Sequence, residues 1–247
     1  MLQNRIIPAL QIKEGLLVKS IKFKNHSYVG DPLNTVNIFN SMEVDEILIL
    51  DINALNNIKY ELIEEMATEC FMPLTYGGGI RSIEVAKKIF SLGVEKIVIG
   101  EKSFNNFKFL NEISRIFGSQ SIVVSIDVKK SIFGRYRLKI KNKFFPIELS
   151  EYIKSLEKAG VGEILLTSVD KEGTFNGLDL DLISFVSENV NIPVIASGGV
   201  GSMADVKAGK DAGASAVAIG SMAVFQNQNR SVLINFPKKS ERQKYGI

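Results

Sequence analysis

The feature that most constrains the fold is an internal repeat, because the chain consists of two halves with the same order and nearly the same spacing of apolar runs. The runs begin at residues 5, 46, 73 and 96 in the first half and at 122, 163, 193 and 216 in the second. The segment MPLTYGGGI (72–80) matches IPVIASGGV (192–200), and GVEKIVIG (93–100) matches GASAVAIG (213–220). Such self-similarity indicates that each half contributes four equivalent structural units.

Each run is short, apolar and rich in β-branched residues, which is typical of strands buried on both faces of a parallel sheet. Between the runs lie helical patterns such as SIEVAKKIFSLG (82–93), which begins with a serine cap and ends at glycine. Eight such units predict one (β/α)8 barrel over residues 1–247, with half-barrels of about 1–120 and 121–225 and an irregular tail over 226–247. The duplication argues against the alternative, a doubly wound open sheet. The predicted strands are residues 5–10, 46–51, 73–76, 96–99, 122–127, 163–168, 193–197 and 216–219.

Composition excludes several classes of protein. No apolar run reaches 18 residues and MLQNRII lacks the pattern of a signal peptide, so we expect a cytoplasmic protein without a membrane partner. The net charge of +3 gives little reason to expect nucleic acid. The single cysteine, Cys70, favours a reducing compartment and is interpreted as a small buried apolar residue. The single histidine, His26, lies far from Cys70 in the sequence, so we expect no His/Cys metal site. We also expect no cofactor.

Glycines follow the predicted strands at the end of the barrel where such folds hold their sites. Gly199 follows the seventh strand, Gly220 and Ser221 follow the eighth, and Gly173 follows the sixth. Because glycine lets backbone N–H groups approach an anion closely, these residues predict a phosphate site in the second half. The alternative is that the glycines only form tight turns.

The mirror position in the first half differs. Gly79 follows the third strand, but Gly100 is followed by Glu101 where the second half has Ser221. An ionised carboxylate donates no hydrogen bond and repels a phosphate. We therefore predict that Glu101 fills the vacated anion position; alternatively, it simply favours a helix N-terminus.

Asp127 ends the fifth strand, where a carboxylate is a credible general acid or base. Its counterpart at the end of the first strand is Gln11, whose amide forms hydrogen bonds but does not transfer protons. Chemistry that needs a carboxylate on each side of a substrate therefore lacks one partner. Asp51 and Asp170 are secondary candidates.

A family resemblance is carried by the motifs RIIPALQIKEGLLVK, YGGGIRSIEVA, IDVKK, GEILLTSVDKEGT and IASGGVG. With these motifs the sequence resembles the cyclase subunit of imidazole glycerol phosphate synthase, and the resemblance extends from the N-terminus to about Phe225. The resemblance implies a half-barrel-duplicated fold, a glutaminase partner at the barrel bottom and a phosphate-bearing substrate at the top. Asp127 matches the second of two catalytic aspartates that the family implies, whereas Gln11 departs from the first. Lys19 matches a substrate-binding lysine. Phosphate-binding positions match at Gly79, Gly199, Gly220 and Ser221, but Gly100-Glu101 replaces an Asn-Thr pair.

The resemblance also implies an ammonia gate of four charged residues at the starts of strands. This sequence matches at Arg5, Glu46, Lys96 and Glu163. The alternative interpretation is that these four residues form ordinary salt bridges that close the end of the barrel.

The residues of the ammonia gate match the family, whereas the residues of the cyclase chemistry differ from it. In this the sequence resembles cyclase-like subunits outside histidine synthesis. That branch implies, besides the barrel and the glutaminase, a third protein: an ATP-dependent amidotransferase that forms amidino groups on bacterial surface sugars. The alternatives are a working cyclase–lyase of histidine biosynthesis and a sugar-phosphate isomerase. Gln11 counts against the isomerase, which needs an acid–base pair.

Two segments have more than one interpretation. Pro237 leaves little room for a long eighth helix, so the tail is either a docking surface for a third protein or a short helix with an ordered extension. Residues 129–145 alternate basic and apolar residues and predict a hairpin. Its basic face is either solvated or contacts a nucleotide, a partner or nucleic acid.

Overall fold

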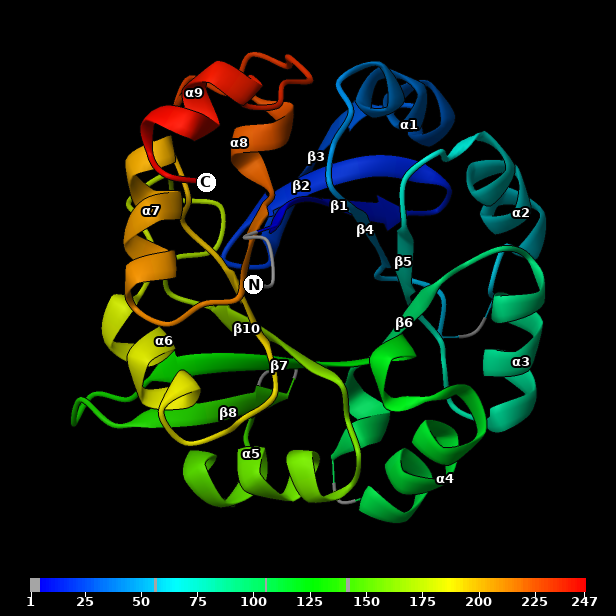
Figure 1. Ribbon diagram of the computed structural model, residues 1–247, viewed down its shortest axis with the longest axis vertical. Coiled ribbons are helices and arrows are strands. Elements are labelled where there is room, and N and C mark those ends of the chain that lie inside the picture. The colour runs from blue at the N-terminus through cyan, green and yellow to red at the C-terminus, as the bar shows by residue number, and fades with distance from the viewer. Residues whose placement is uncertain (1–4, 56, 105, 141–142) are drawn as a thin grey trace.

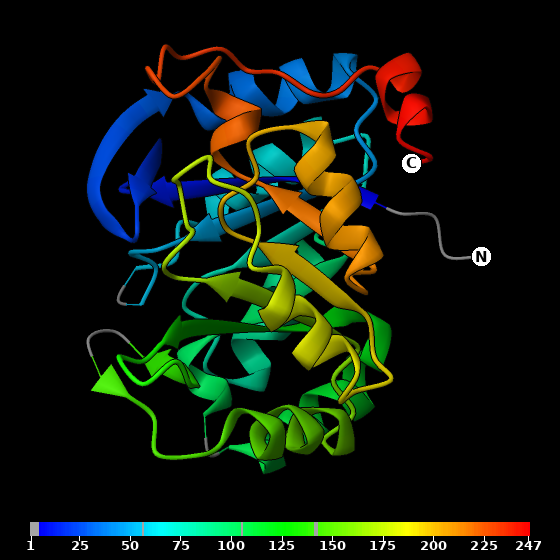
Figure 2. The same cartoon turned by 90° about the vertical axis from the view of Figure 1, so that its left-hand side faces the viewer.

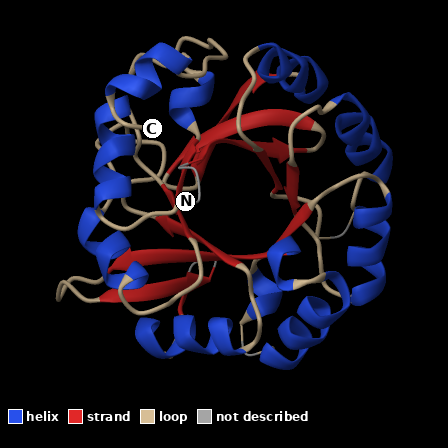
Figure 3. Ribbon diagram, in the orientation of Figure 1, coloured by secondary structure: helices blue, strands red, loops and turns tan. Residues whose placement is uncertain are grey.

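The protein is a closed barrel of eight parallel strands inside a ring of helices, as predicted (Figures 1 and 3). The computed structural model describes residues 5–55, 57–104, 106–140 and 143–247. Every predicted strand is confirmed, and each begins within one residue of the predicted start. The barrel strands are β1 (Arg5–Lys13), β4 (Ile47–Asp51), β5 (Leu74–Gly77), β6 (Lys96–Ile99), β7 (Ile122–Lys130), β10 (Glu163–Ser168), β11 (Val194–Ser197) and β12 (Ala216–Ile219).

Helices form after the strands because the segments between one strand and the next contain capping residues and apolar faces. Ser82 caps its helix by accepting a hydrogen bond from the Val85 N–H, and Ser202 forms a capping box with Asp205. The outer helices are α1 (Pro32–Ser41), α2 (Tyr60–Glu69), α3 (Ile83–Ser91), α4 (Phe107–Phe117), α5 (Leu149–Lys158), α6 (Leu180–Ser187) and α7 (Met203–Asp211). Within the described residues, no helix is long and apolar enough to cross a membrane.

The first strand of each half continues into an antiparallel extension. β1 pairs with β2 (Leu16–Ile21), which pairs with β3 (Lys24–Gly30), and β7 pairs with β8 (Tyr136–Ile140), which pairs with β9 (Lys143–Phe144). The predicted hairpin after the fifth barrel strand is thus confirmed. Both extensions project from the end of the barrel opposite the C-terminus (Figure 2). They form the walls of the opening at the carboxyl ends of the barrel strands, which we call the mouth.

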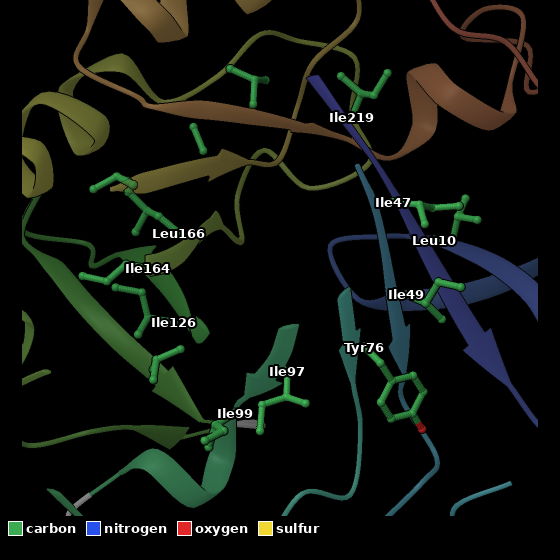
Figure 4. Close-up of a cluster of buried hydrophobic side chains, with 14 of the residues drawn as sticks. Leu10, Ile47, Ile49, Tyr76, Ile97, Ile99, Ile126, Ile164, Leu166 and Ile219 are labelled. Carbon is green, nitrogen blue, oxygen red and sulfur yellow. The ribbon is translucent and has the colours of Figure 1, made fainter. Parts of the chain in front are cut away.

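The core has two layers because alternate side chains of each strand point inward and outward. The outward layer packs under the helices and includes Leu10, Ile49, Ile97, Ile126 and Leu166 (Figure 4). A separate inward cluster fills the barrel itself. It consists of Ile7, Leu48, Val98, Val123, Leu165, Ile195, Ala216 and Ala218.

The C-terminal segment replaces the eighth outer helix. α8 (Ser221–Val224) has only four residues, and the chain then runs along the barrel to α9 (Lys239–Lys244) (Figure 2). The tail predicted as irregular therefore contains one short helix. It is anchored by the buried Phe236 and by Arg242, whose guanidinium lies 2.9 Å from the Asp45 carboxylate.

Candidate functional site

A cavity of about 540 Å³ opens at the carboxyl ends of the barrel strands. Its floor reaches Leu48, Val98 and Leu165 of the inward cluster, so it continues into the apolar interior. A pocket of this size, apolar below and polar above, suits a small molecule. The predicted residues that line it are Gln11, Lys19, Gly79, Asp127 and Gly220, together with Gly100, Glu101 and Asp51.

Gln11 and Asp127 lie on opposite sides of the mouth, because β1 and β7 are four strands apart around the eight-stranded barrel. The Gln11 side chain is buried, and its Oε1 accepts no hydrogen bond from the described residues. A buried acceptor without a donor is costly, so this atom is suited to an N–H or O–H donor in the cavity.

Asp127 lines the mouth cavity and is partly buried. Burial, together with the charge of Glu172, raises the pKa of Asp127 to about 7, against a weaker opposing effect of Lys139. A carboxyl that titrates near neutral pH can both donate and accept a proton under working conditions.

The raised pKa of Asp127 predicts that the free energy of unfolding depends on pH. The folded protein binds the Asp127 proton more tightly than the unfolded chain, so this group contributes its full stability below about pH 4 and loses it as pH rises through 7. We expect Asp127→Asn to be more stable than the wild type at pH 8 by about 2 kcal/mol, after discounting for water in the cavity. The gain should shrink at pH 5, measured by urea unfolding. Asp170→Asn is the control and should change stability by less than about 0.5 kcal/mol at both pH values.

Lys19 lies on β2 with its side chain buried and forms an ion pair with Glu172. Glu172 was not among the predicted site residues, although it directly precedes Gly173 in the motif VDKEGT. The Lys19 ammonium lies over Gly220, where a Cβ atom would come within 2.5 Å of Nζ. The ion pair therefore ties the first-half extension to the second-half loops across the mouth.

The second-half glycines come together around a narrow cleft lined by Gly173, Gly199, Gly220 and Ser221. A Cβ at Gly199 would lie 2.2 Å from the Gly177 carbonyl, and φ is +104° there. Tight packing alone thus requires this glycine. The buried Ser221 hydroxyl is different, because it has no hydrogen-bond partner among the described residues. An unpaired hydroxyl at this position can donate a hydrogen bond to a group placed beside the glycine loops.

The first-half counterpart is more open. A Cβ at Gly79 would lie 2.6 Å from the Ala54 carbonyl, but a Cβ at Gly100 would meet nothing within 4 Å. Glu101 is exposed and is the first residue of the short 3-10 helix η1 (Glu101–Ser103). Of the secondary candidates, Asp51 lines the mouth cavity, whereas Asp170 lies outside it, 4.0 Å from Lys129.

Four charged residues form a closed ring at the other end of the barrel. Arg5 lies 2.6 Å from Glu46 and 3.1 Å from Glu163, and Lys96 lies 3.0 Å from Glu46 and 3.1 Å from Glu163. Cations and anions alternate, so the ring is neutral. Thr75, which the sequence reasoning missed, donates a hydrogen bond of 2.7 Å to Glu46. Burial alone would lower the pKa of Arg5, but the two carboxylates outweigh it and raise that pKa.

Among the described residues, no group of three His, Cys, Asp or Glu side chains is placed to hold a metal ion. Cys70 is half-buried, and burial raises the pKa of its thiol to about 11. A thiol so reluctant to ionise is a poor nucleophile.

Residues 5–229 match the family model described as histidine biosynthesis protein. The chain is 47% identical over 243 residues to the "Putative imidazole glycerol phosphate synthase subunit hisF2" of Pseudomonas aeruginosa, covering 96% of this chain and 97% of the relative. It is 43% identical over 212 residues to the imidazole glycerol phosphate synthase subunit HisF of Lactococcus lactis, covering 83% and 82%. The chain therefore belongs to the HisF family of histidine biosynthesis proteins, as a divergent member.

Proposed function

We propose that this protein is the barrel subunit of a glutamine amidotransferase and carries ammonia from a glutaminase partner at the ring end to the mouth. The observation that supports this most strongly is the closed ring of Arg5, Glu46, Lys96 and Glu163 beneath an apolar interior. A neutral ring of paired charges repels neither ion nor dipole at long range, and an apolar passage favours neutral ammonia over ammonium.

The residues at the mouth support delivery of ammonia rather than cyclisation of a substrate. Gln11 takes the place of a carboxylate opposite Asp127, so the paired acid–base chemistry of a cyclase lacks one group. The unpaired Gln11 Oε1 can accept a hydrogen bond from ammonia as it leaves the apolar interior. We assign the next step to a third, ATP-dependent amidotransferase that forms an amidine on a bacterial surface sugar, on the strength of the resemblance to that branch.

The second candidate is a working cyclase of histidine biosynthesis. Asp127 with a pKa of about 7 and the intact second-half glycine loops favour it. The deciding assay supplies the bisphosphate substrate of imidazole glycerol phosphate synthase with an ammonium salt at high pH. Turnover at the rate of an ordinary cyclase would replace the conduit proposal with this one.

The ammonia route is tested at the ring. With the glutaminase partner and the amidotransferase present, Lys96→Met should lower glutamine-driven product formation about tenfold, a barrier change of about 1.4 kcal/mol. Ammonium-driven formation should stay unchanged, because free ammonia reaches the acceptor without the ring. Lys88→Met, on the exposed face of α3, is the matched control. Equal glutamine-driven rates in both variants would refute the gate.

A further inference from the structure

A groove of about 460 Å³ lies beside the mouth, between the tip of the β2–β3 hairpin and the β8–β9 ribbon. We call it the lysine groove, after the residues that line it: Lys22, Lys24, Lys129, Lys139 and Lys143. Among the described residues lining it, the only acid is Asp170, so five lysines against one aspartate give +4. The whole chain carries only +3. Positive charge is thus gathered at one concave place, which attracts an anion.

The walls of the groove are fixed by backbone contacts. Lys22 and Phe23 form the two-residue hairpin turn with φ of +51° and +61°, a conformation that residues other than glycine rarely adopt. The Lys22 N–H donates to the Glu172 carbonyl at 2.9 Å, which ties the turn to the loop after β10. Asp170, which also lines the groove, accepts a hydrogen bond of 3.1 Å from the Lys130 N–H. The lysines therefore project from a preformed frame.

An aromatic ring stands at the edge of the groove. Phe144 is 43% exposed, and the Arg137 guanidinium lies 5.0 Å from its ring centroid. Exposed aromatic rings and guanidinium planes are the surfaces on which nucleobases stack. Lysines, which can bind phosphate groups, beside such a ring match the two ends of a nucleotide.

The groove is continuous with the barrel mouth. Lys22, Lys24 and Lys139 also line a smaller cavity of about 370 Å³ that reaches Asp127 and Gly100. A ligand whose phosphates lie on these lysines would therefore have its far end beside the mouth.

From these contacts we infer that the lysine groove binds the diphosphate of a nucleoside diphosphate group, with its base against Phe144. The groove has the volume of a small-molecule site. Nucleic acid would require an extended basic face, and the basic residues here enclose a bounded cavity instead. The inference does not depend on the proposed ammonia route, because it concerns a different set of residues.

The test is calorimetric titration of the purified full-length chain with ADP and with UDP at low salt. We expect both to bind, and Lys24→Ala/Lys143→Ala to weaken binding at least about tenfold through the loss of two charged contacts. Lys87→Ala/Lys88→Ala, which removes the same charge from the exposed face of α3, should leave the affinity unchanged. Matching thermal unfolding midpoints would show that both double variants are folded.

Phe144→Ala separates the nucleoside from its phosphates. It should weaken binding of ADP and UDP severalfold and leave binding of inorganic pyrophosphate unchanged. The inference is overturned by an absence of binding at about 1 mM nucleotide, the weak end of specific recognition. It is equally overturned if the two lysine double variants bind alike, if Phe144→Ala binds nucleotides as the wild type does, or if only a single-stranded oligonucleotide binds.

Discussion

Replacing Glu46 by alanine is expected to lower the free energy of unfolding by about 3 kcal/mol, because it breaks a buried ion-pair ring rather than a surface contact. The Glu46 carboxylate is almost fully buried and accepts from Arg5, Lys96 and Thr75. Without it, two partly buried cations share Glu163 alone, and the ring acquires a net positive charge. Urea unfolding at neutral pH measures the loss.

Glu95→Ala is the matched control for that experiment, since Glu95 is exposed and directly precedes Lys96. It should change stability by less than about 0.5 kcal/mol. Glu46→Gln should fall between the two, because the amide still accepts from Thr75 but no longer balances the cations. If Glu46→Ala and Glu95→Ala cost the same, the ring does not hold the barrel end together.

The barrel was predictable from sequence because its signal is local and repeated. Each strand is a short apolar run, and the duplication supplies every run twice. The ring residues were found only through the family resemblance, since spacing does not say that Arg5 and Glu163 meet. Once the barrel closes, residues that begin strands share one end of it, and opposite charges there are driven together.

What the sequence did not reveal are partners that only the closed barrel brings together. Glu172 reaches Lys19 across 153 positions, and Thr75 reaches Glu46 from the neighbouring strand. The anchoring of the tail by Arg242 on Asp45 spans 197 positions. The motifs mark Lys19 and Glu46 as single residues, but no periodicity or motif says which side chain each of them meets.

Gln11→Asp is expected to increase ammonium-dependent turnover of the cyclase substrate about 100-fold over the wild type, the lower range for one added general acid or base. The substitution places a second carboxyl opposite Asp127, on β1, in a cavity already lined by Lys19. The pH profile should become bell-shaped, because one carboxyl must be protonated and the other ionised. Gln11→Asn keeps an amide at this position and should stay at the wild-type rate. Should Gln11→Asp fold normally and still match Gln11→Asn, the missing carboxylate is not what separates this barrel from a cyclase, and the altered Gly100-Glu101 loop becomes the next position to restore.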